Sequence, residues 1–193
     1  ISLQGLVGSK TLTAEVGLPA ILSANVPVSL DFGNVTRLSL ERAAAGAANR
    51  IGFTTQPQIA LRDSAGNIVT GTIATISFSV TPSATISNSA VAVNTSTGVA
   101  TFVGTSLQGT VGSYTMSFSV TGASASSIAT VSQVISLTHG TATGLAVVQE
   151  PSSVRVGFTT SALVIRVVDA EGNLVNTGNS ATSSATVLIG AGS

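Results

Sequence analysis

The sequence predicts an all-β fold made of tandem antiparallel β-sandwich domains, and three observations support this. Glu, Lys and Arg, which favour helices, are scarce, whereas Ser, Thr, Val, Ala and Gly dominate the 193 residues. Apolar and polar residues alternate with a period of two in several short segments, as they do in strands with one buried face. Similar segments recur about every hundred residues, so the chain reads as a repeat array.

The clearest alternation lies in residues 113–121. One side of this predicted strand is Ser or Thr throughout, and the other is apolar: Tyr114, Met116, Phe118 and Val120. Glycines at 109 and 112 supply a turn before it. Phe102 falls on the apolar side of another alternating segment. We therefore predict that the Phe102 and Phe118 rings share one sandwich core.

The repeat defines the domain organisation. Residues 2–16 copy the segment from Ser106 onward at a shift of 104 (109 − 5 for the first glycine), and Gly33 matches Gly140 at 107 (140 − 33). The difference places a three-residue insertion near residues 122–127. We predict that 1–35 form the C-terminal part of one repeat, 36–140 a complete repeat and 141–193 the N-terminal part of the next. A period of about 105 residues suits an Ig-like sandwich, and we interpret the chain as an excerpt from a longer array.

Within the complete repeat, the first strand is predicted at 36–41 and a loop of small residues at 43–49. In the next strand Ile59 and Leu61 face inward, while Gln58, Ala60 and Arg62 face outward. Residues 63–67 form a turn, because Asp bonds to its own backbone and Gly supplies a positive φ. The remaining elements are strands near 76–80, 91–93, 98–103, 113–121 and 128–137, with a hairpin turn at 95–98.

Two segments of the third repeat copy the complete one. Residues 157–160 repeat 52–55 at a shift of 105 (157 − 52), and 169–175 repeat 63–69 at 106 (169 − 63). The predicted linkers, near 33–36 and 140–143, are short and should limit bending between domains.

Composition excludes several classes of function. Seven basic and seven acidic residues balance, and no block of like charge forms a nucleic-acid footprint. No apolar run approaches the roughly 18 residues of a membrane span. The start at Ile1 lacks the features of a signal peptide, so the signal of a secreted protein would lie upstream or would have been removed. The absence of Cys fits a domain that holds without bridges or an exported prokaryotic protein, and it does not decide between compartments.

Candidate chemistry is sparse, and we predict no catalytic, cofactor-binding or metal-binding residues. His139 is the only histidine, so one chain cannot assemble a Ser–His–Asp set or a histidine metal cluster, and we expect a polar turn residue. Asp63 and Asp169 could be calcium ligands at domain junctions. Calcium needs six to eight oxygens, and the chain has seven acids in all, so we prefer turn-forming Asp.

Two modification signals remain open. Asn34-Val35-Thr36 and Asn94-Thr95-Ser96 are sequons, which are glycosylation sites or chance in a chain rich in these residues. Lys10 is the only lysine, and its counterpart is Tyr114. A repeated Lys–Asn crosslink is therefore excluded.

Three segments carry a family resemblance. Asp63-Ser-Ala-Gly-Asn67, Gly98-Val-Ala-Thr-Phe102 and Gly112-Ser-Tyr-Thr-Met116 together resemble the Ig-like repeats of giant bacterial surface proteins, the invasin/intimin-type and related adhesin arrays. The resemblance covers residues 36–140 and parts of both flanks. It implies a β-sandwich spacer, with ligand recognition in a terminal module outside this chain. Lys10 departs from the pattern at the position of Tyr114, which we predict to pack as a tyrosine corner.

The predicted surface is unusually apolar. Only 7% of the residues are charged, against about a quarter in most globular domains. Val164 and Val168 are predicted to face outward, as are Ala60 and Ala74 on comparable strands. We predict that copies of the chain pack on one another end to end and side by side. A neutral, soluble Ser/Thr/Ala surface is the alternative.

The function predicted is a non-catalytic structural segment of a long extracellular, cell-surface protein, working as a stalk or as a self-assembling filament or sheath. One alternative is an adhesin whose sandwich loops bind a cell-surface glycan. The lack of Trp and the single Tyr argue against an aromatic-lined groove. The other alternative is a non-catalytic appendage of a secreted enzyme.

Overall fold

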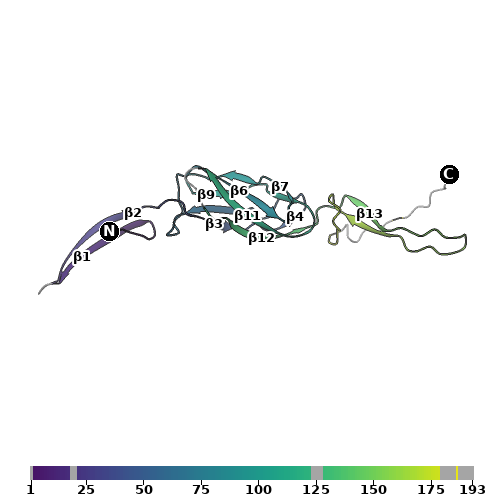
Figure 1. Cartoon of the computed structure of the whole chain (residues 1–193), viewed down its shortest axis with the longest axis horizontal. Helices are drawn as coiled ribbons and strands as arrows, with labels where there is room; N and C mark the ends of the chain where they lie inside the picture. The colour runs from purple at the N-terminus through teal and green to yellow at the C-terminus, as the bar shows by residue number, and fades with distance from the viewer. Residues whose placement is uncertain (1, 18–20, 123–127, 179–185, 187–193) are drawn as a thin grey trace.

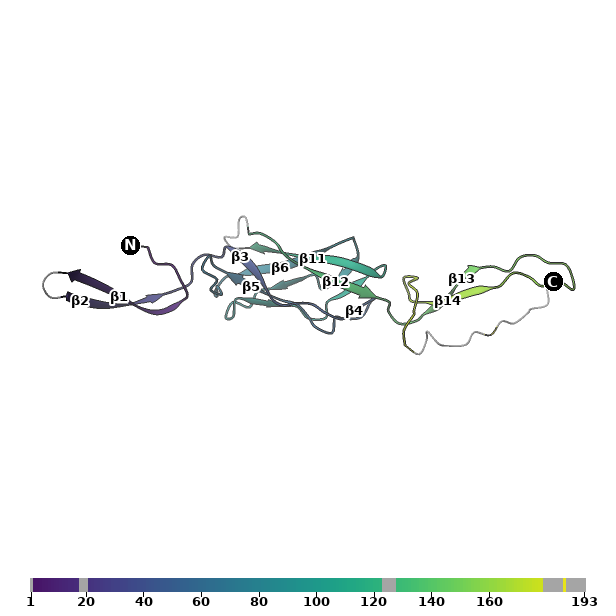
Figure 2. The ribbon, with the colours of Figure 1, turned by 90° about the horizontal axis from the view of Figure 1, so that it is seen from below.

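The computed structural model describes residues 2–17, 21–122, 128–178 and 186, and every regular element in these ranges is a β-strand. A central body lies between two separate β-hairpins, in a row (Figures 1 and 2). The first hairpin consists of β1 (Gly8–Gly17) and β2 (Ile21–Leu30), and the other of β13 (Gly144–Gln149) and β14 (Val164–Val168). The fold is thus all-β with several sheets.

The central body contains two main sheets. One has five strands in the order β4-β12-β11-β6-β8, and the other has three in the order β3-β5-β9. Their bounds are β3 (Arg37–Arg42), β4 (Ala47–Ala48), β5 (Gln58–Arg62), β6 (Ala74–Thr81), β8 (Ala90–Ala92), β9 (Val99–Thr101), β11 (Gly112–Gly122) and β12 (Val131–Thr138). The short strands β7 (Thr85–Ser87) and β10 (Ser106–Gln108) pair with each other. All described strand pairs are antiparallel except β4 with β12, which is parallel, so the prediction of a purely antiparallel fold is wrong at this edge.

One hydrophobic core joins the two sheets. Phe78 and Phe118 come from the five-stranded sheet, and Phe102 follows β9 of the other sheet. The Phe102 and Phe118 ring centroids lie 5.8 Å apart, and Phe78 is within 5.5 Å of both. All three rings are buried. The predicted packing of Phe102 with Phe118 is confirmed, because the alternation places both side chains toward the opposite sheet.

Three local predictions about the central body are wrong. The predicted loop 43–49 contains β4, which pairs with β12, and both Ala47 in this strand and Ala44 before it are buried. Ala60 and Ala74 are buried rather than exposed. The turn at 95–98 forms, with the Gly98 amide donating to Asn94 O, but its flanking strands enter different sheets. A turn signal does not specify which partner each strand takes, and here β8 pairs with β6 and β9 with β5.

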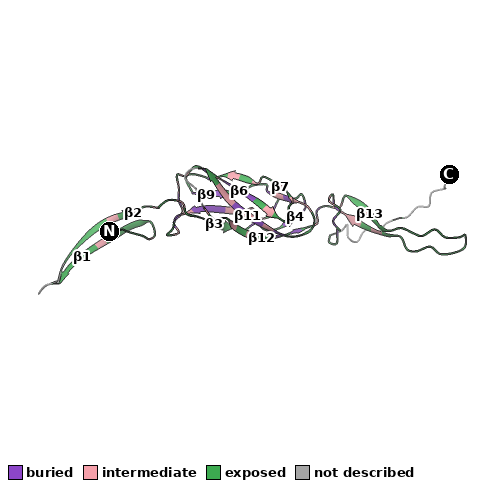
Figure 3. Cartoon of the chain, in the orientation of Figure 1, coloured by how far each residue is buried: buried purple, intermediate pink, exposed green. Residues whose placement is uncertain are grey.

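The end hairpins reproduce strand registers of the central body. Gly8 pairs with Leu30 as Gly112 pairs with Leu137, at shifts of 104 (112 − 8) and 107 (137 − 30). The pairing of β13 with β14 likewise repeats that of β3 with β5, including an irregularity at the same place, between Leu40 and Arg42 and between Val147 and Gln149. Figure 3 shows the contrast in burial: the strands of the central body alternate buried residues with more exposed ones, whereas the strands of the end hairpins contain intermediate and exposed residues. The predicted insertion at 122–127 lies almost wholly outside the described residues.

No helix in the described ranges is both long enough and apolar enough to cross a membrane.

Candidate functional site: two junction clamps

The most densely connected polar groups lie where the central body meets each end hairpin. Each junction is built around one copy of the predicted turn, at 63–67 and at 169–173. In both turns the amide of the Asp donates to the carbonyl of the Asn four residues on, at 3.0 Å. The glycine in between has a positive φ, 94° at Gly66 and 80° at Gly172, which favours a residue without Cβ. The turn prediction is confirmed, but the turn also holds two parts of the chain together.

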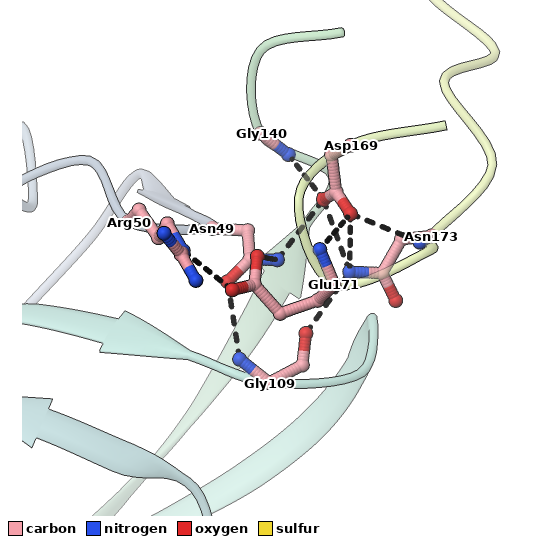
Figure 4. A network of polar contacts seen from close by, with 7 residues as sticks. All are labelled: Asn49, Arg50, Gly109, Gly140, Asp169, Glu171 and Asn173. Atoms are coloured by element: carbon pink, nitrogen blue, oxygen red, sulfur yellow. Dashed lines mark hydrogen bonds and ion pairs between the residues drawn. The ribbon is translucent and has the colours of Figure 1, made fainter. Parts of the chain in front are cut away.

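Asp169 is the centre of the second junction (Figure 4). Its carboxylate accepts from the Gly140 amide at 2.9 Å, from Asn49 Nδ2 at 3.0 Å and from the Asn173 amide at 2.9 Å. The amide of Glu171 and Asn173 Nδ2 also donate to it. Burial alone would raise the pKa of Asp169. The hydrogen bonds from Gly140, Asn49 and Asn173 outweigh burial and hold the pKa well below its usual range.

Asn173 carries the contact across the junction to the loop before β11. Its Nδ2 donates to Gly109 O at 3.0 Å, and its Oδ1 accepts from the Val111 amide at 2.9 Å. The same Nδ2 donates to Asp169, so Asp169 aligns the amide that reaches the central body. Asn173 is 6% exposed, which makes these bonds costly to break without replacement.

The first junction repeats this geometry residue for residue. The Gly33 amide donates to Asp63 Oδ2 at 2.9 Å, and Asn67 Nδ2 donates to Gly5 O at 3.0 Å. Asn67 Oδ1 accepts from the Val7 amide at 3.0 Å. The bond from the Gly33 amide is the main reason that the pKa of Asp63 falls from 3.8 to about 2, and the Asn67 side chain adds to it. We call each set, residues 5, 7, 33, 63 and 67 or 109, 111, 140, 169 and 173, a junction clamp.

At the second junction, side chains of the central body add further contacts. Asn49 is 2% exposed and bridges the parts, because its Nδ2 donates to Asp169 and its Oδ1 accepts from the Gly109 amide at 3.0 Å. Arg50 forms an ion pair with Glu171. The residue equivalent to Glu171 in the first turn is Ala65 (171 − 106), so this ion pair has no counterpart there.

His139 belongs to the same junction. Its Nε2 lies 2.7 Å from Thr177 Oγ1 and its Nδ1 lies 2.9 Å from Gly140 O. It therefore lies just before the predicted linker and also contacts the following part of the chain. Its counterpart in the first junction is Phe32 (139 − 107).

Tyr114 braces the loop that receives Asn173. Its hydroxyl donates to Thr110 O at 2.7 Å, four residues upstream, and the side chain is 3% exposed. This is the geometry of a tyrosine corner, as predicted. A larger residue at Gly109 would crowd this hydroxyl, because a Cβ there would lie 3.0 Å from Tyr114 Oη. Lys10 occupies the position in the first hairpin, so the Gly5 loop has no such brace.

The two linker glycines differ in the space around them. A Cβ on Gly140 would lie 2.5 Å from the backbone oxygen of Asn49, which is impossible without a backbone shift. A Cβ on Gly33 would meet Asp63 Cβ at 3.7 Å, an ordinary contact. Gly140 therefore packs directly against the backbone of the central body.

The clamp carboxylates are engaged by N–H donors rather than arranged around an empty centre. Among the described residues, no three His, Cys, Asp or Glu side chains gather as metal ligands would. A cation at Asp63 or Asp169 would have to displace amide hydrogen bonds. Of the sequon residues, Asn34 and Asn94 are exposed, and Asn94 Oδ1 accepts from the Ser96 amide at 2.9 Å.

Sequence reasoning found Asp63 and Asp169 but not what their turns do. It missed Asn49, Asn67 and Asn173 as bridging residues. A signal was present, since the segments that recur most faithfully are the glycine loops at 5 and 109, the linker glycines at 33 and 140, and the Asp and Asn of both turns. The structure shows that these segments contact one another.

No protein-family model matches the chain, and no curated protein sequence matches it. Among solved structures, a likeness is found to the surface layer protein SbsC, domains 1–6, with a TM-score of 0.35 and 16% sequence identity. It covers 88% of this chain and 20% of that one, so this chain spans about a fifth of that protein's length. A TM-score this low supports no argument about fold or function.

Proposed function

We propose that the chain is a non-catalytic structural segment of a long extracellular surface protein, in which junction clamps hold successive Ig-like β-sandwich repeats in line. One observation carries the proposal: the same five-residue clamp occurs at both junctions, built from residues that recur along the chain. A device that repeats with the domains acts on the relation between domains. The predicted resemblance to bacterial adhesin arrays agrees with a spacer of this kind.

The clamp suits a spacer because it restrains direction. Asn173 bonds to two backbone groups of one loop, Gly109 O and the Val111 amide, while Asp169 bonds to the linker amide of Gly140. These contacts tie both the loop before β11 and the linker to one turn, so a bend that separates the turn from either of them stretches a hydrogen bond. Bending would also leave buried polar groups without partners, at about 1–3 kcal/mol for each group.

The polar side chains of the two junction clamps are already engaged in hydrogen bonds. In the described part of the chain, no buried side-chain nitrogen or oxygen lacks a hydrogen-bond partner. Asp63 and Asp169 keep low pKa values, so neither acts as a proton donor near neutral pH. These saturated, low-pKa groups support the structural role that we propose. A stalk needs only this stiffness, whereas a filament or sheath also needs contacts between copies.

Small-angle X-ray scattering of the full chain, extrapolated to zero concentration, tests the proposal. The native chain should give a rod-like distance distribution. Asn67→Ala combined with Asn173→Ala should give a shorter mean end-to-end distance and a broader distribution, while strand content by circular dichroism stays the same. Ser132→Ala, on an exposed strand position, is the control and should change neither. Equal profiles for the native chain and the double variant would overturn the proposal.

A further inference from the structure

We propose that the outer face of the five-stranded sheet packs sideways on the same face of a second copy of this chain. The inference rests on the proposed function only in that a long array would present the face repeatedly. It goes further by naming both the surface and the partner.

The strands β12, β11, β6 and β8 define this face by their alternation. Their inward residues form the core, and their outward residues line up in cross-strand rows. None of the outward residues is buried. We call the set the hydroxyl face, because all are Ser or Thr except one Val and two Ala. Row by row they are Ser136 and Ser113; Val134, Thr115 and Thr81; Ser132, Ser117 and Ser79; Ser119, Ser77 and Ala90; and Thr121, Thr75 and Ala92.

The outer faces of the two sheets differ in charge. All residues of the hydroxyl face lie in the described part of the chain, and none of them is charged. On the three-stranded sheet Arg37, Glu41 and Arg62 lie on the outer side, and Arg62 pairs with Glu41 at 2.8 Å. A surface that stays in water usually has a quarter or more of its residues charged, whereas the core of an interface is depleted of charge. The sandwich thus has one face suited to water and one suited to contact.

Hydroxyl groups make the face complementary to itself. Each hydroxyl donates one hydrogen bond and accepts others, so two such faces bond without matched charges. Among the described residues, only Ser77 and Ser119 of this face bond to each other, with their Oγ atoms 3.3 Å apart. Small side chains also allow two sheets to approach closely, as in stacked sheets. A charged partner would find no counter-charge here and a glycan no aromatic platform, which favours a second copy.

The pattern of the face recurs with the repeat. The first hairpin has uncharged residues at the positions of the first three β11–β12 pairs, at shifts of 104 and 107. They are Ser9 with Ser29, Thr11 with Pro27 and Thr13 with Asn25. The next outward residue of β1 is Glu15, where the central body has Ser119. Much of the face is therefore kept in a second repeat, so that contacts between two arrays would add up by avidity.

The size of the face predicts weak association between single chains. Strand and residue spacings give about 33 Å² of sheet for each outward residue, hence about 450 Å² for the face and about 900 Å² for two copies. This is below the total of about 1,200 Å² at which stable interfaces begin. The face also has no aromatic or Arg residue to anchor it. A single chain should therefore dimerise with a Kd of about 0.1–1 mM.

Sedimentation equilibrium of the full chain tests the proposal at concentrations up to about 2 mM, above the expected Kd. The native chain should form dimers at the upper end. Ser117→Arg and Ser117→Glu, at the centre of the face, should each raise the Kd about tenfold or more, because an unpaired charge would be buried. Thr101→Arg, at an exposed position of the other sheet, should leave the Kd unchanged. A native chain that stays monomeric, a Ser117 variant that associates like the native chain, or an equal loss in Thr101→Arg would overturn the proposal.

Nuclear magnetic resonance locates the contact without any substitution. Raising the concentration of the native chain should shift the amide signals of β12, β11 and β6 and leave those of β3 and β5 unchanged. Shifts confined to the three-stranded sheet or to the end hairpins would refute the proposal. So would a chain that stays monomeric while maltoheptaose, a neutral oligosaccharide, shifts the signals of the hydroxyl face. Junction stiffness is measured at zero concentration, so sideways packing can fail while the clamp proposal stands.

Discussion

The two junctions share a framework and differ in what is added to it. In both, the Asp and Asn side chains of one turn bond to main-chain groups of the preceding part and of the linker. At the first junction these groups are the carbonyl of residue 5 and the amides of residues 7 and 33. At the second they are the carbonyl of residue 109 and the amides of residues 111 and 140. Main-chain groups do not depend on which side chains surround them. The same clamp can therefore form at both junctions although the side chains around it differ.

The additions at the second junction depend on side chains and vary accordingly. The Arg50–Glu171 pair and the Tyr114 brace belong to it. At the first junction Glu171 is replaced by Ala65 and Tyr114 by Lys10. We infer that the shared bonds to main-chain groups determine how the parts are aligned, and that the extra side-chain contacts determine how strongly they are held together. Opening the second junction should therefore cost more free energy.

Loss of a clamp Asn should have the largest effect. Asn173→Ala leaves Gly109 O and the Val111 amide without partners and should weaken the second junction by about 2–3 kcal/mol. Hydrogen exchange at the Val111 amide reports this opening directly. Asn67→Ala should likewise speed hydrogen exchange at the Val7 amide and leave the Val111 amide protected. If Asn173→Ala also exposed Val7, the two junctions would not be independent.

Substitutions of the two linker glycines should have the next largest effect, and the effect should differ between the junctions. Gly140→Ala forces a methyl group against the Asn49 carbonyl and should cost about 1–3 kcal/mol of second-junction stability. Gly33→Ala makes only ordinary contact and should change the first junction by less than about 0.5 kcal/mol. Hydrogen exchange at the amide of residue 140 measures the stability of the second junction, and exchange at the amide of residue 33 measures that of the first. Equal tolerance at both positions would show that the second linker is not closely packed.

Acid should open both junctions. The folded-state pKa of Asp63 is about 2, below the ordinary 3.8, and that of Asp169 is also lowered. A carboxylate with a depressed pKa stabilises the folded state fully above about pH 4, and this contribution is lost as the pH falls toward 2. Amide exchange at Gly33 and Gly140 between pH 5 and pH 2, corrected for intrinsic rates, follows the loss. Asp63→Asn and Asp169→Asn should lower junction stability at pH 7 and flatten this pH dependence.

Removing the ion pair should have a smaller effect. Glu171→Ala should weaken the second junction by at most about 1 kcal/mol, because the Arg50 side chain is 54% exposed and solvent screens the pair. The loss should shrink at high salt, whereas that of Asn173→Ala should not. A large, salt-independent effect would mean that Glu171 acts through its bond with Asn49 instead.

Chelation should have no effect at all. EDTA should leave the thermal unfolding of the chain unchanged, because amide donors already occupy the carboxylates of Asp63 and Asp169. A lowered transition temperature that calcium restores would identify either junction as a cation site.

Much of the fold could be predicted from alternation alone. The inward set at Ile59, Leu61 and Phe118 follows from the two-residue period, and the Asp63 turn from Asp and Gly chemistry. The pattern could not reveal that Ala60 is buried, because a small residue on an outward face gives no sign of what covers it. The parallel pairing of β4 with β12 was likewise invisible in a loop of alanines.

The site was only half predictable for a related reason. Asp63 and Asp169 stand out by residue type and turn position. Asn49, by contrast, lies in a segment with no pattern, and its partner Asp169 is 120 residues away. Such long-range contacts appear in the sequence only indirectly, as segments that recur together with the repeat.

The central claim, that the clamp holds neighbouring parts in one orientation, is tested most directly by a distance measurement across the second junction. The chain has no Cys, so Ser132→Cys and Arg166→Cys, both at exposed positions, allow spin labels on the central body and on β14. Double electron–electron resonance, with labelled chains diluted in unlabelled protein, should give one narrow distance distribution. Asn173→Ala should broaden it. A broad distribution in the native chain, or an equally narrow one after Asn173→Ala, would contradict the account.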